Sequence, residues 1–366
     1  MLSKLSLTGK IVFLSIILQA IIVSVLECLV VYFHVNYVSH YTLDKQGQGI
    51  SEADLIYHAI FILSLGFQIV IAADALWHRN VVQLLSLVVF NLLSLIYASI
   101  QLYQHKILED RGLSSDIFNP SNDFPTHEYT MNYYESRMRP LEYVIIGMVS
   151  GFSLFLGLLS INLTREFGWE NYKTYSADMD IRKAYVSLSV LQTLIKLDIF
   201  FIGSYAIQLI PSQKIGYNMS IVEIVLIFFC GTMILLISWF SIVHEMKYLL
   251  LCVINMLCIS LIYLIYELVR INIVKDPDPY EFTRRFLTFF LSTTWCLIFF
   301  TVVYSIICFR NMMKGIYVIT DEEELEENPR KKRFSRILSP THKPTSNRQS
   351  AIDQRRTRLS RRETLD

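Results

Sequence analysis

The stretch from Met219 to Val243 reads M-S-I-V-E-I-V-L-I-F-F-C-G-T-M-I-L-L-I-S-W-F-S-I-V and decides the fold class. Its only charged residue is Glu223, near its beginning, and residues 224–243 carry no charge. A helix needs about 20 consecutive apolar residues to cross the hydrocarbon layer of a bilayer. We therefore predict that this stretch is a transmembrane helix.

Similar stretches recur along the chain. Hydrophobic residues make up 53% of the 366 positions and charged residues 18%, which is more apolar than is usual for a soluble chain of this length. We predict an all-α polytopic membrane protein, whose transmembrane domain covers residues 1–310. Its eight spans are predicted at about residues 11–33, 55–76, 81–103, 141–163, 185–210, 219–243, 248–269 and 286–309.

The links between the spans predict the topology. Two links are very short, at Trp77–Asn80 and His244–Lys247, and predict antiparallel hairpins of neighbouring helices. An even number of spans places both termini on one side, together with the basic 164–184 link and a basic C-terminal segment. Because Lys and Arg gather on the cytoplasmic side of a membrane, both termini are predicted to be cytoplasmic.

The longest link, residues 104–140, then lies on the lumenal side. It is rich in Asn, Pro, Ser and Tyr and is acidic on balance, which is typical of a solvated loop. A carboxylate-lined metal site in this link is the alternative, although no ligand spacing is visible in it.

The C-terminal segment, residues 311–366, is predicted to be a disordered cytoplasmic tail. An acidic run at Asp321–Glu327 precedes a basic run at Arg330–Arg336, and such a composition buries too little apolar surface to fold. Its candidate phosphorylation sites, three after basic residues and one before a proline, are Ser335, Ser360, Thr364 and Ser339. Phosphates there would weaken attraction to anionic lipid; the alternative is a tail that only solubilises.

Two opposite charges interrupt the fifth predicted span, in the stretch L-I-K-L-D-I-F-F from Leu194 to Phe201. Lys196 and Asp198 are two positions apart, so on a helix they point to nearly opposite faces. Gln192 lies on the Lys196 side, and Glu27 lies in the first span. These polar residues form either an ion or proton relay, or interhelical contacts that fix packing. Both interpretations stay open at this point.

Enzyme signatures are missing from the sequence. It contains no H-E-x-x-H, no G-x-S-x-G and no G-x-x-x-x-G-K-[ST], and its eight histidines are scattered along the chain. We therefore expect no enzymatic activity, no cofactor and no metal site.

One segment resembles a known family. From Glu166 the chain reads E-F-G-W-E-N-Y-K-T-Y-S-A-D and then enters the span that contains K-L-D-I-F-F. This resembles a family of uncharacterised fungal multi-pass Golgi apparatus membrane proteins, whose members carry E-F-G-W-x-x-Y-K-x-x-G-A-D and a K-F-D-F-F-F-like entry into a span. Ser176 replaces the family's glycine, and Leu197 replaces an aromatic residue. The motif residues that match include Glu166, Gly168, Trp169, Tyr172, Lys173, Asp178 and Arg182. The resemblance implies a Golgi membrane and no particular reaction.

The motif also has a meaning without the family. Its aromatic residues, Phe167 and Trp169 among them, are interleaved with charges, a pattern typical of an interfacial segment with rings at the lipid headgroups. The alternatives are a docking surface for a cytoplasmic partner or a gate over Lys196.

Three functional hypotheses follow. The preferred one is a non-enzymatic component of Golgi trafficking, sorting or organisation. The second is an ion- or proton-coupled transporter using Lys196 and Asp198, and the third is a receptor-like sensor. The expected partners are the lipid bilayer and cytoplasmic trafficking proteins that bind the tail; no nucleic acid partner is expected.

Overall fold

A computed structural model describes residues 5–38, 41–43, 45–112, 118–120, 133–174, 179–216, 221–273 and 280–314. These residues all belong to one compact unit, Met1–Val318. Within them, eight helices are long and apolar enough to cross a membrane. The predicted all-α polytopic class, with eight spans, is thereby confirmed.

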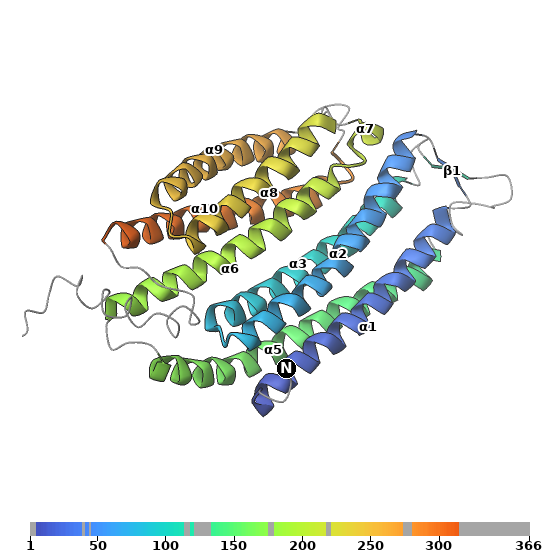
Figure 1. The fold of residues 1–366 in the computed structure, drawn as a ribbon. Helices are drawn as coiled ribbons and strands as arrows, with labels where there is room; N and C mark the ends of the chain where they lie inside the picture. Colours follow the sequence, from blue (N-terminus) through green and yellow to red (C-terminus); the bar gives the residue numbers. More distant parts are fainter. Residues whose placement is uncertain are drawn as a thin grey trace, which may run out of the picture. The chain divides into compact units, whose positions relative to one another are not determined.

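All of the long helices except α8 are longer than the predicted spans. Their bounds are α1 Leu7–Val38, α2 Lys45–Trp77, α3 Val81–Gly112, α5 Arg139–Thr174, α6 Met179–Gln208, α8 Ile221–Val243, α9 Lys247–Asn272 and α10 Arg284–Met313 (Figure 1). The 36 residues of α5 correspond to about 54 Å at 1.5 Å per residue, whereas the hydrocarbon layer is about 30 Å thick. The helices therefore extend beyond the apolar runs that reveal them in the sequence.

Short elements complete the described chain. A turn of π-helix, η2 (Tyr134–Met138), leads into α5, and the four-residue α7 (Ser212–Ile215) follows α6. The strands β1 (Tyr41–Leu43) and β2 (Phe118–Pro120) pair antiparallel, with Tyr41 opposite Pro120. This pairing joins the α1–α2 link to the link after α3.

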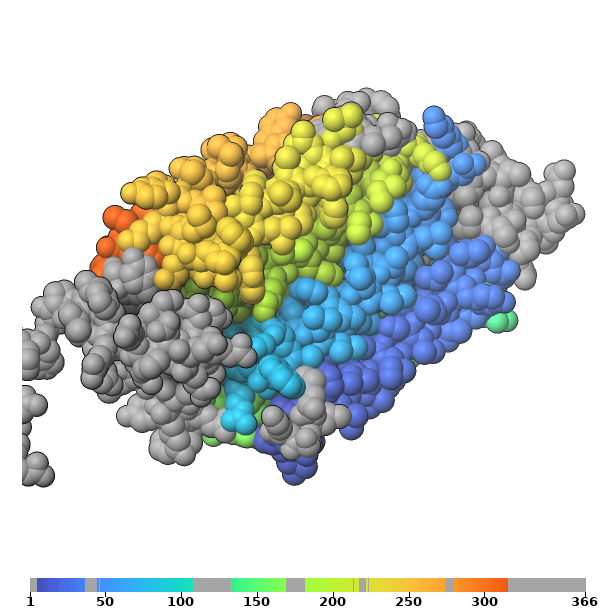
Figure 2. Space-filling view, viewed as in Figure 1, coloured from blue at the N-terminus to red at the C-terminus, as the bar shows by residue number. Residues whose placement is uncertain are grey.

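The long helices form two groups of four. In the N-terminal group, α1 packs on α2 and α5, and α3 packs on the same two helices. In the C-terminal group, α10 packs on α6 and α9, and α8 packs on the same two. Contacts of α6 with α2 and α3 join the groups, and Figure 2 shows α1, α2, α6 and α8 side by side on one face.

Aromatic rings fill the junction between the two groups. Phe67 of α2 stacks on Phe200 of α6 with ring centroids 4.6 Å apart, and Tyr57 of α2 stacks on Phe286 of α10 at 3.9 Å. Each such pair stabilises a fold by about 0.5–1.5 kcal/mol beyond the area that it buries. The junction is therefore a packed core and not a water-filled passage.

The two predicted hairpins are confirmed. Arg79 in the α2–α3 link and Glu245 in the α8–α9 link have positive φ angles of 49° and 52°, which let the chain reverse within a few residues. The Asn80 side chain accepts hydrogen bonds from the backbone N–H groups of Val82 and Gln83, at 3.0 and 3.3 Å. Asn80 therefore caps α3.

The longest predicted link, residues 104–140, is shorter in the structure than predicted. Helix α3 continues past Tyr103 to Gly112, so Gln104 and His105 are buried helical residues and not loop residues. The Gln104 amide donates to the Phe282 carbonyl, which explains why a polar residue tolerates burial there. The predicted tail beyond Lys314 lies outside the described residues, together with Ser335, Ser339, Ser360 and Thr364.

Candidate metal centre

Three histidines and three carboxylates meet inside the N-terminal helix group. All six side chains are buried, with at most 4% of any residue exposed: Glu27, His34, Asp54, His58, His105 and Glu142. They come from all four helices of the group, α1, α2, α3 and α5. Isolated ionisable residues are costly at membrane depth, so such a cluster requires mutual pairing or a bound ion.

Helical periodicity brings these residues to one place. Asp54 and His58 are four positions apart on α2, and Gln101 and His105 are four apart on α3, so each pair shares a helix face. Neighbouring helices run antiparallel, so the end of α3 lies beside the beginning of α2. The cluster therefore occupies one end of the helix group.

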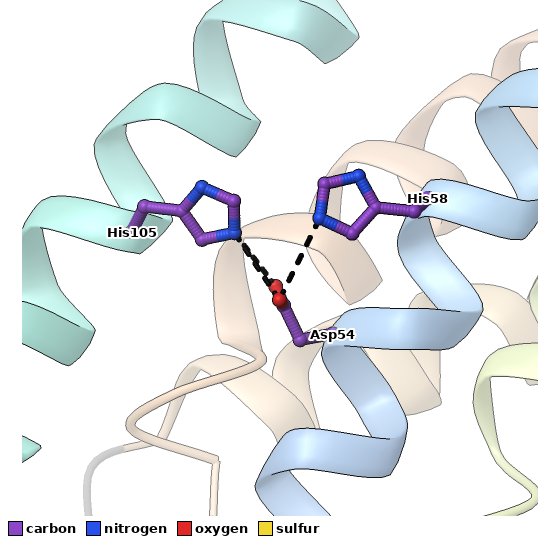
Figure 3. Close-up of side chains that lie close together, drawn as sticks. All are labelled: Asp54, His58 and His105. Carbon is purple, nitrogen blue, oxygen red and sulfur yellow. Dashed lines mark hydrogen bonds and ion pairs between the residues drawn. The ribbon is translucent and has the colours of Figure 1, made fainter. Parts of the chain in front are cut away.

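Asp54 is the centre of the cluster. Its carboxylate oxygens lie 3.0 Å from Nε2 of His105 and 3.6 Å from Nε2 of His58, and Figure 3 shows the two imidazole rings converging on it from α3 and α2. His34 of α1 approaches the same carboxylate, with Nδ1 at 3.2 Å from Oδ2. Three imidazoles thus face one carboxylate.

The other ring nitrogens of two histidines contact separate carboxylates. Nδ1 of His58 lies 2.6 Å from Glu27 Oε2, and Nδ1 of His105 contacts Glu142 Oε1. In the contacts with Asp54, Nε2 is the donor. An ion between the rings and Asp54 would take the place of the proton on each Nε2, while the proton on Nδ1 stays in its contact with the outer carboxylate. This is the carboxylate–histidine arrangement that orients imidazole ligands around metal ions in proteins.

The spacing of the three central atoms fits a small dication. The candidate ligand atoms of Asp54, His58 and His105 all lie within 4.8 Å of one another. In a tetrahedral site with bonds of about 2.1 Å, ligand atoms are about 3.4 Å apart. Asp54 Oδ2 lies 3.2 Å from His105 Nε2 and 3.6 Å from His58 Nε2, which bracket that value. The residues present therefore fit a zinc-like ion without rearrangement of the helices.

Two buried oxygens strengthen the case for an added positive charge. Glu27 Oε1 and Glu142 Oε2 are buried and have no hydrogen-bond partner among the described residues. With neutral imidazoles, the three carboxylates give the cluster three negative charges in a low-dielectric interior. Either protons on the imidazoles or a dication must balance this charge. A dication bound at Asp54 would balance two of the three negative charges.

The residues singled out in the sequence occupy three separate places. Glu27 belongs to the cluster, where the Gln101 amide donates to it at 3.2 Å. Lys196 pairs with Asp74 on α2, and Gln192, one turn earlier on the same helix, is half-buried. Asp198 is buried on α6. The relay that combined Glu27, Lys196 and Asp198 therefore has no basis in the geometry.

Asp198 has its own partner. The hydroxyl of Thr301 on α10 donates to Asp198 Oδ2 at 2.5 Å. This contact joins two helices of the C-terminal group, as the packing interpretation predicts. The Glu267–Arg270 pair on α9, with a separation of 2.9 Å, is a second polar contact in that group.

The family motif is mostly the end of a long helix. Glu166, Gly168, Trp169, Tyr172 and Lys173 continue α5, which runs to Thr174. Phe167, expected at the lipid headgroups, is instead buried, with 3% exposed. Arg182 is exposed near the beginning of α6, and Asp178 lies outside the described residues.

Five members of the cluster were not predicted from the sequence: His34, Asp54, His58, His105 and Glu142. The histidines are scattered along the sequence but not in space, because α1, α2 and α3 bring three of them together. The pairs D-x-x-x-H at Asp54–His58 and Q-x-x-x-H at Gln101–His105 were the available signal. His105 also lay beyond the predicted end of its span.

Comparison with known proteins adds the cellular setting. A UPF0658 Golgi apparatus membrane protein of Schizosaccharomyces pombe (strain 972) is 22% identical over 266 residues, which cover 70% of this chain and 75% of that protein. The chain resembles a Golgi membrane protein. No family model matches it, and no solved structure matches its fold.

The relative confirms the family resemblance that the motif indicated, to an uncharacterised family of Golgi membrane proteins. Together with the eight apolar helices, it supports a multi-pass protein of the Golgi membrane.

Proposed function

We propose that this Golgi membrane protein binds a divalent transition-metal ion inside its N-terminal helix group. Asp54, His58 and His105 are the ligands, and His34 is the candidate fourth ligand. One observation carries the proposal: two imidazoles present Nε2 to the same carboxylate while a separate buried carboxylate contacts each Nδ1. Protonated imidazoles paired with carboxylates on both sides would have the same orientation, so the metal content of the purified protein distinguishes the two.

The donor set selects the class of ion. Imidazole nitrogen together with carboxylate oxygen suits zinc, iron, cobalt or manganese, whereas calcium and magnesium prefer oxygen alone. The ligands are almost completely buried, which favours an ion that is held over one that is open to a soluble substrate. The proposal therefore agrees with the expectation of a non-enzymatic protein.

Within the Golgi, the role in trafficking, sorting or organisation remains part of the proposal. It rests on the composition of the tail and on the motif at the end of α5. With both termini in the cytoplasm, as the basic residues predict, the metal centre lies at the lumenal end of the helices. The centre would then stabilise the group that carries the cytoplasmic motif.

Transport of the bound ion is the second candidate. It is favoured by the position of the ligands within helices that are long enough to span the membrane, where buried ionisable residues often mark ion paths. It replaces the version that relied on Lys196 and Asp198. Zinc or manganese flux into vesicles reconstituted with the purified protein distinguishes it from a resident ion.

The metal content of the purified protein tests the proposal. The full chain is purified in detergent after growth in zinc-, iron- and manganese-supplemented medium, and bound metal is measured by mass spectrometry. We expect about one ion per chain in the wild type and in His244→Gln, a matched control on the exposed α8–α9 link. The double variant His58→Gln/His105→Gln should lose it.

The absence of bound metal would contradict the proposal. A wild-type protein that retains no metal and shows no gain in melting temperature with any of the three ions would leave a proton-balanced ion-pair network. The melting temperature of each variant shows whether it is still folded when it loses metal. If the cluster serves packing alone, the variants change in stability but the number of metal ions per chain does not change.

A further inference from the structure

A cavity lies in the C-terminal helix group, away from the candidate metal centre of the N-terminal group. It has a volume of about 540 Å³ and is walled by α6, α8, α9 and α10, which is within the range of small-molecule binding sites. Most of its lining is aliphatic, including Ile202, Leu257 and Ile298. None of the sequence motifs, and no part of the proposed metal function, accounts for it.

The cavity opens toward the lipid. Three of its lining residues are also exposed on the outside of α8 and α9: Val222 (72% exposed), Leu226 (56%) and Ile259 (62%). Leu226 and Ile259 belong to spans that are long and apolar enough to cross a membrane, so in a bilayer these two side chains face hydrocarbon and not water. Val222 lies just before the span on α8. An occupant therefore enters sideways from the bilayer.

The depth of the cavity matches one leaflet. Its lining on α8 extends from Val222, next to the beginning of the helix, to Leu235. Thirteen residues of helix correspond to about 20 Å, and half of the hydrocarbon layer is about 15 Å thick. A single acyl chain that starts at headgroup depth therefore has room along this wall.

A close helix contact shapes the inner wall. Gly231 of α8 faces Ile202 of α6, and a Cβ atom at this glycine would lie 3.1 Å from Ile202 Cγ2. The missing side chain thus lets α8 approach α6 there.

The end of the cavity near the helix termini is polar. Tyr205 lines the cavity in the last turn of α6 and is 1% exposed. Its hydroxyl has no hydrogen-bond partner among the described residues. A buried hydroxyl normally has a partner, so this one indicates a missing acceptor or donor in the cavity.

The charges around Tyr205 favour a neutral partner. Glu267 and Arg270 lie near enough to interact electrostatically with Tyr205, but they pair with each other at 2.9 Å. Their charges cancel locally, so the polar end offers a hydroxyl donor or acceptor and no net charge. A strongly anionic headgroup would find no uncompensated cation there.

We propose that the cavity binds one neutral two-chain lipid with a hydroxyl-bearing headgroup, of the diacylglycerol class. One acyl chain lies in the cavity, the second stays in the bilayer, and the headgroup hydroxyl or ester carbonyl pairs with the Tyr205 hydroxyl. The apolar walls, the lateral opening and the unpartnered hydroxyl together define this chemistry.

The test uses a photoactivatable, clickable diacylglycerol analogue. The purified full chain is placed in phosphatidylcholine nanodiscs that contain the probe, irradiated and digested, and labelled peptides are identified by mass spectrometry. We expect labelling in α8 and α9 around Leu226 and Ile259. Excess unlabelled diacylglycerol should compete, whereas phosphatidylserine should not.

Three variants connect the labelling to the cavity. Ser260→Phe adds a ring to the cavity lining and should reduce labelling about tenfold, whereas Asn255→Phe places the same ring on an exposed position of α9 and should change nothing. Tyr205→Phe removes only the hydroxyl and should reduce labelling about fivefold, as expected for one hydrogen bond. Melting temperatures confirm that the variants are folded.

Two results would overturn the proposal. If Ser260→Phe melts like the wild type and is labelled equally, the probe reports annular lipid only. If an equivalent phosphatidylcholine probe labels the same peptides equally well, and Tyr205→Phe has no effect on either probe, the cavity does not recognise the headgroup.

Discussion

His58 connects two carboxylates from different helices. Its Nδ1 lies 2.6 Å from Glu27 of α1, and its Nε2 faces Asp54 one turn earlier on its own helix. The contact fixes the direction of the ring, because rotation about the side-chain bonds would break both interactions. The same relationship repeats for His105 with Glu142 and Asp54, so the centre is built from two like halves.

The outer carboxylates should therefore control metal affinity without touching the metal. Glu27→Gln keeps the size of the side chain but weakens the hydrogen bond to His58. Loss of such an outer partner typically weakens binding by 10- to 100-fold, and we expect a weakening of about that size in competition with a chromogenic chelator. Glu52→Gln is the matched control, because Glu52 pairs with Lys214 on the surface. Equal affinities in the two variants would contradict the assigned role of Glu27.

Removal of the ion should destabilise the folded protein. A ligand present at about 100 times its dissociation constant stabilises the native state by about 2.7 kcal/mol. We expect a membrane-impermeable chelator to lower the melting temperature of the detergent-solubilised wild type and of His244→Gln. The double variant His58→Gln/His105→Gln should melt at a lower temperature from the start and should not respond to the chelator. A response of that variant equal to the wild type would place the metal elsewhere.

The two charges in the fifth span should behave differently when they are neutralised. Lys196 and Asp74 are partly exposed, with 31% and 28% of their side chains accessible, so Lys196→Met should cost about 1 kcal/mol. Asp198 is completely buried, and its Oδ1 has no partner among the described residues. Asp198→Asn keeps the shape and a partner for Thr301 without the charge, so its unfolding free energy should equal or exceed that of the wild type.

Urea or thermal unfolding in detergent measures the free energy of unfolding of both variants. A loss of more than about 2 kcal/mol on Asp198→Asn would indicate that the ionised carboxylate itself is required, because breaking a buried charged contact costs that much or more. Lys196→Met combined with Asp74→Asn should be less costly than the sum of the single variants, since neither then leaves a charge without its partner.

Hydropathy is sufficient to predict the number and approximate positions of the helices, because the thickness of the hydrocarbon layer sets the length of each apolar run. It does not reveal where the helices end. The polar residues Gln104 and His105 interrupt the apolar run at Tyr103, yet the helix continues because Phe282 and Glu142 supply their hydrogen-bond partners. Those partners lie far away in the sequence, so a local pattern cannot contain them.

Local pairs could be predicted and distant ones could not. Glu267 and Arg270 are three residues apart on one helix, so their pairing follows from helical geometry alone. Asp54 and His105 lie on different helices, and their meeting depends on which helices are neighbours. The pairs Asp54–His58 and Gln101–His105 mark polar faces near the ends of two helices. Once α2 and α3 are known to form a hairpin, those two faces are the natural place for a site.

The stability of the α8–α9 link should depend on pH through Glu245. Half-burial in the link raises the pKa of the Glu245 carboxyl above its usual 4.5, because the charged form loses water. A carboxyl with a raised pKa in the folded state is fully tolerated below the pKa of the unfolded chain and becomes destabilising as pH rises through the folded-state pKa. Glu245→Gln should therefore melt like the wild type at pH 4 and at a higher temperature at pH 7. Glu135→Gln on η2, where the carboxylate pairs with Arg139 at 2.6 Å in a mostly exposed position, is the control. If Glu245→Gln shows no gain between these pH values, the carboxylate has a compensating partner in the folded protein.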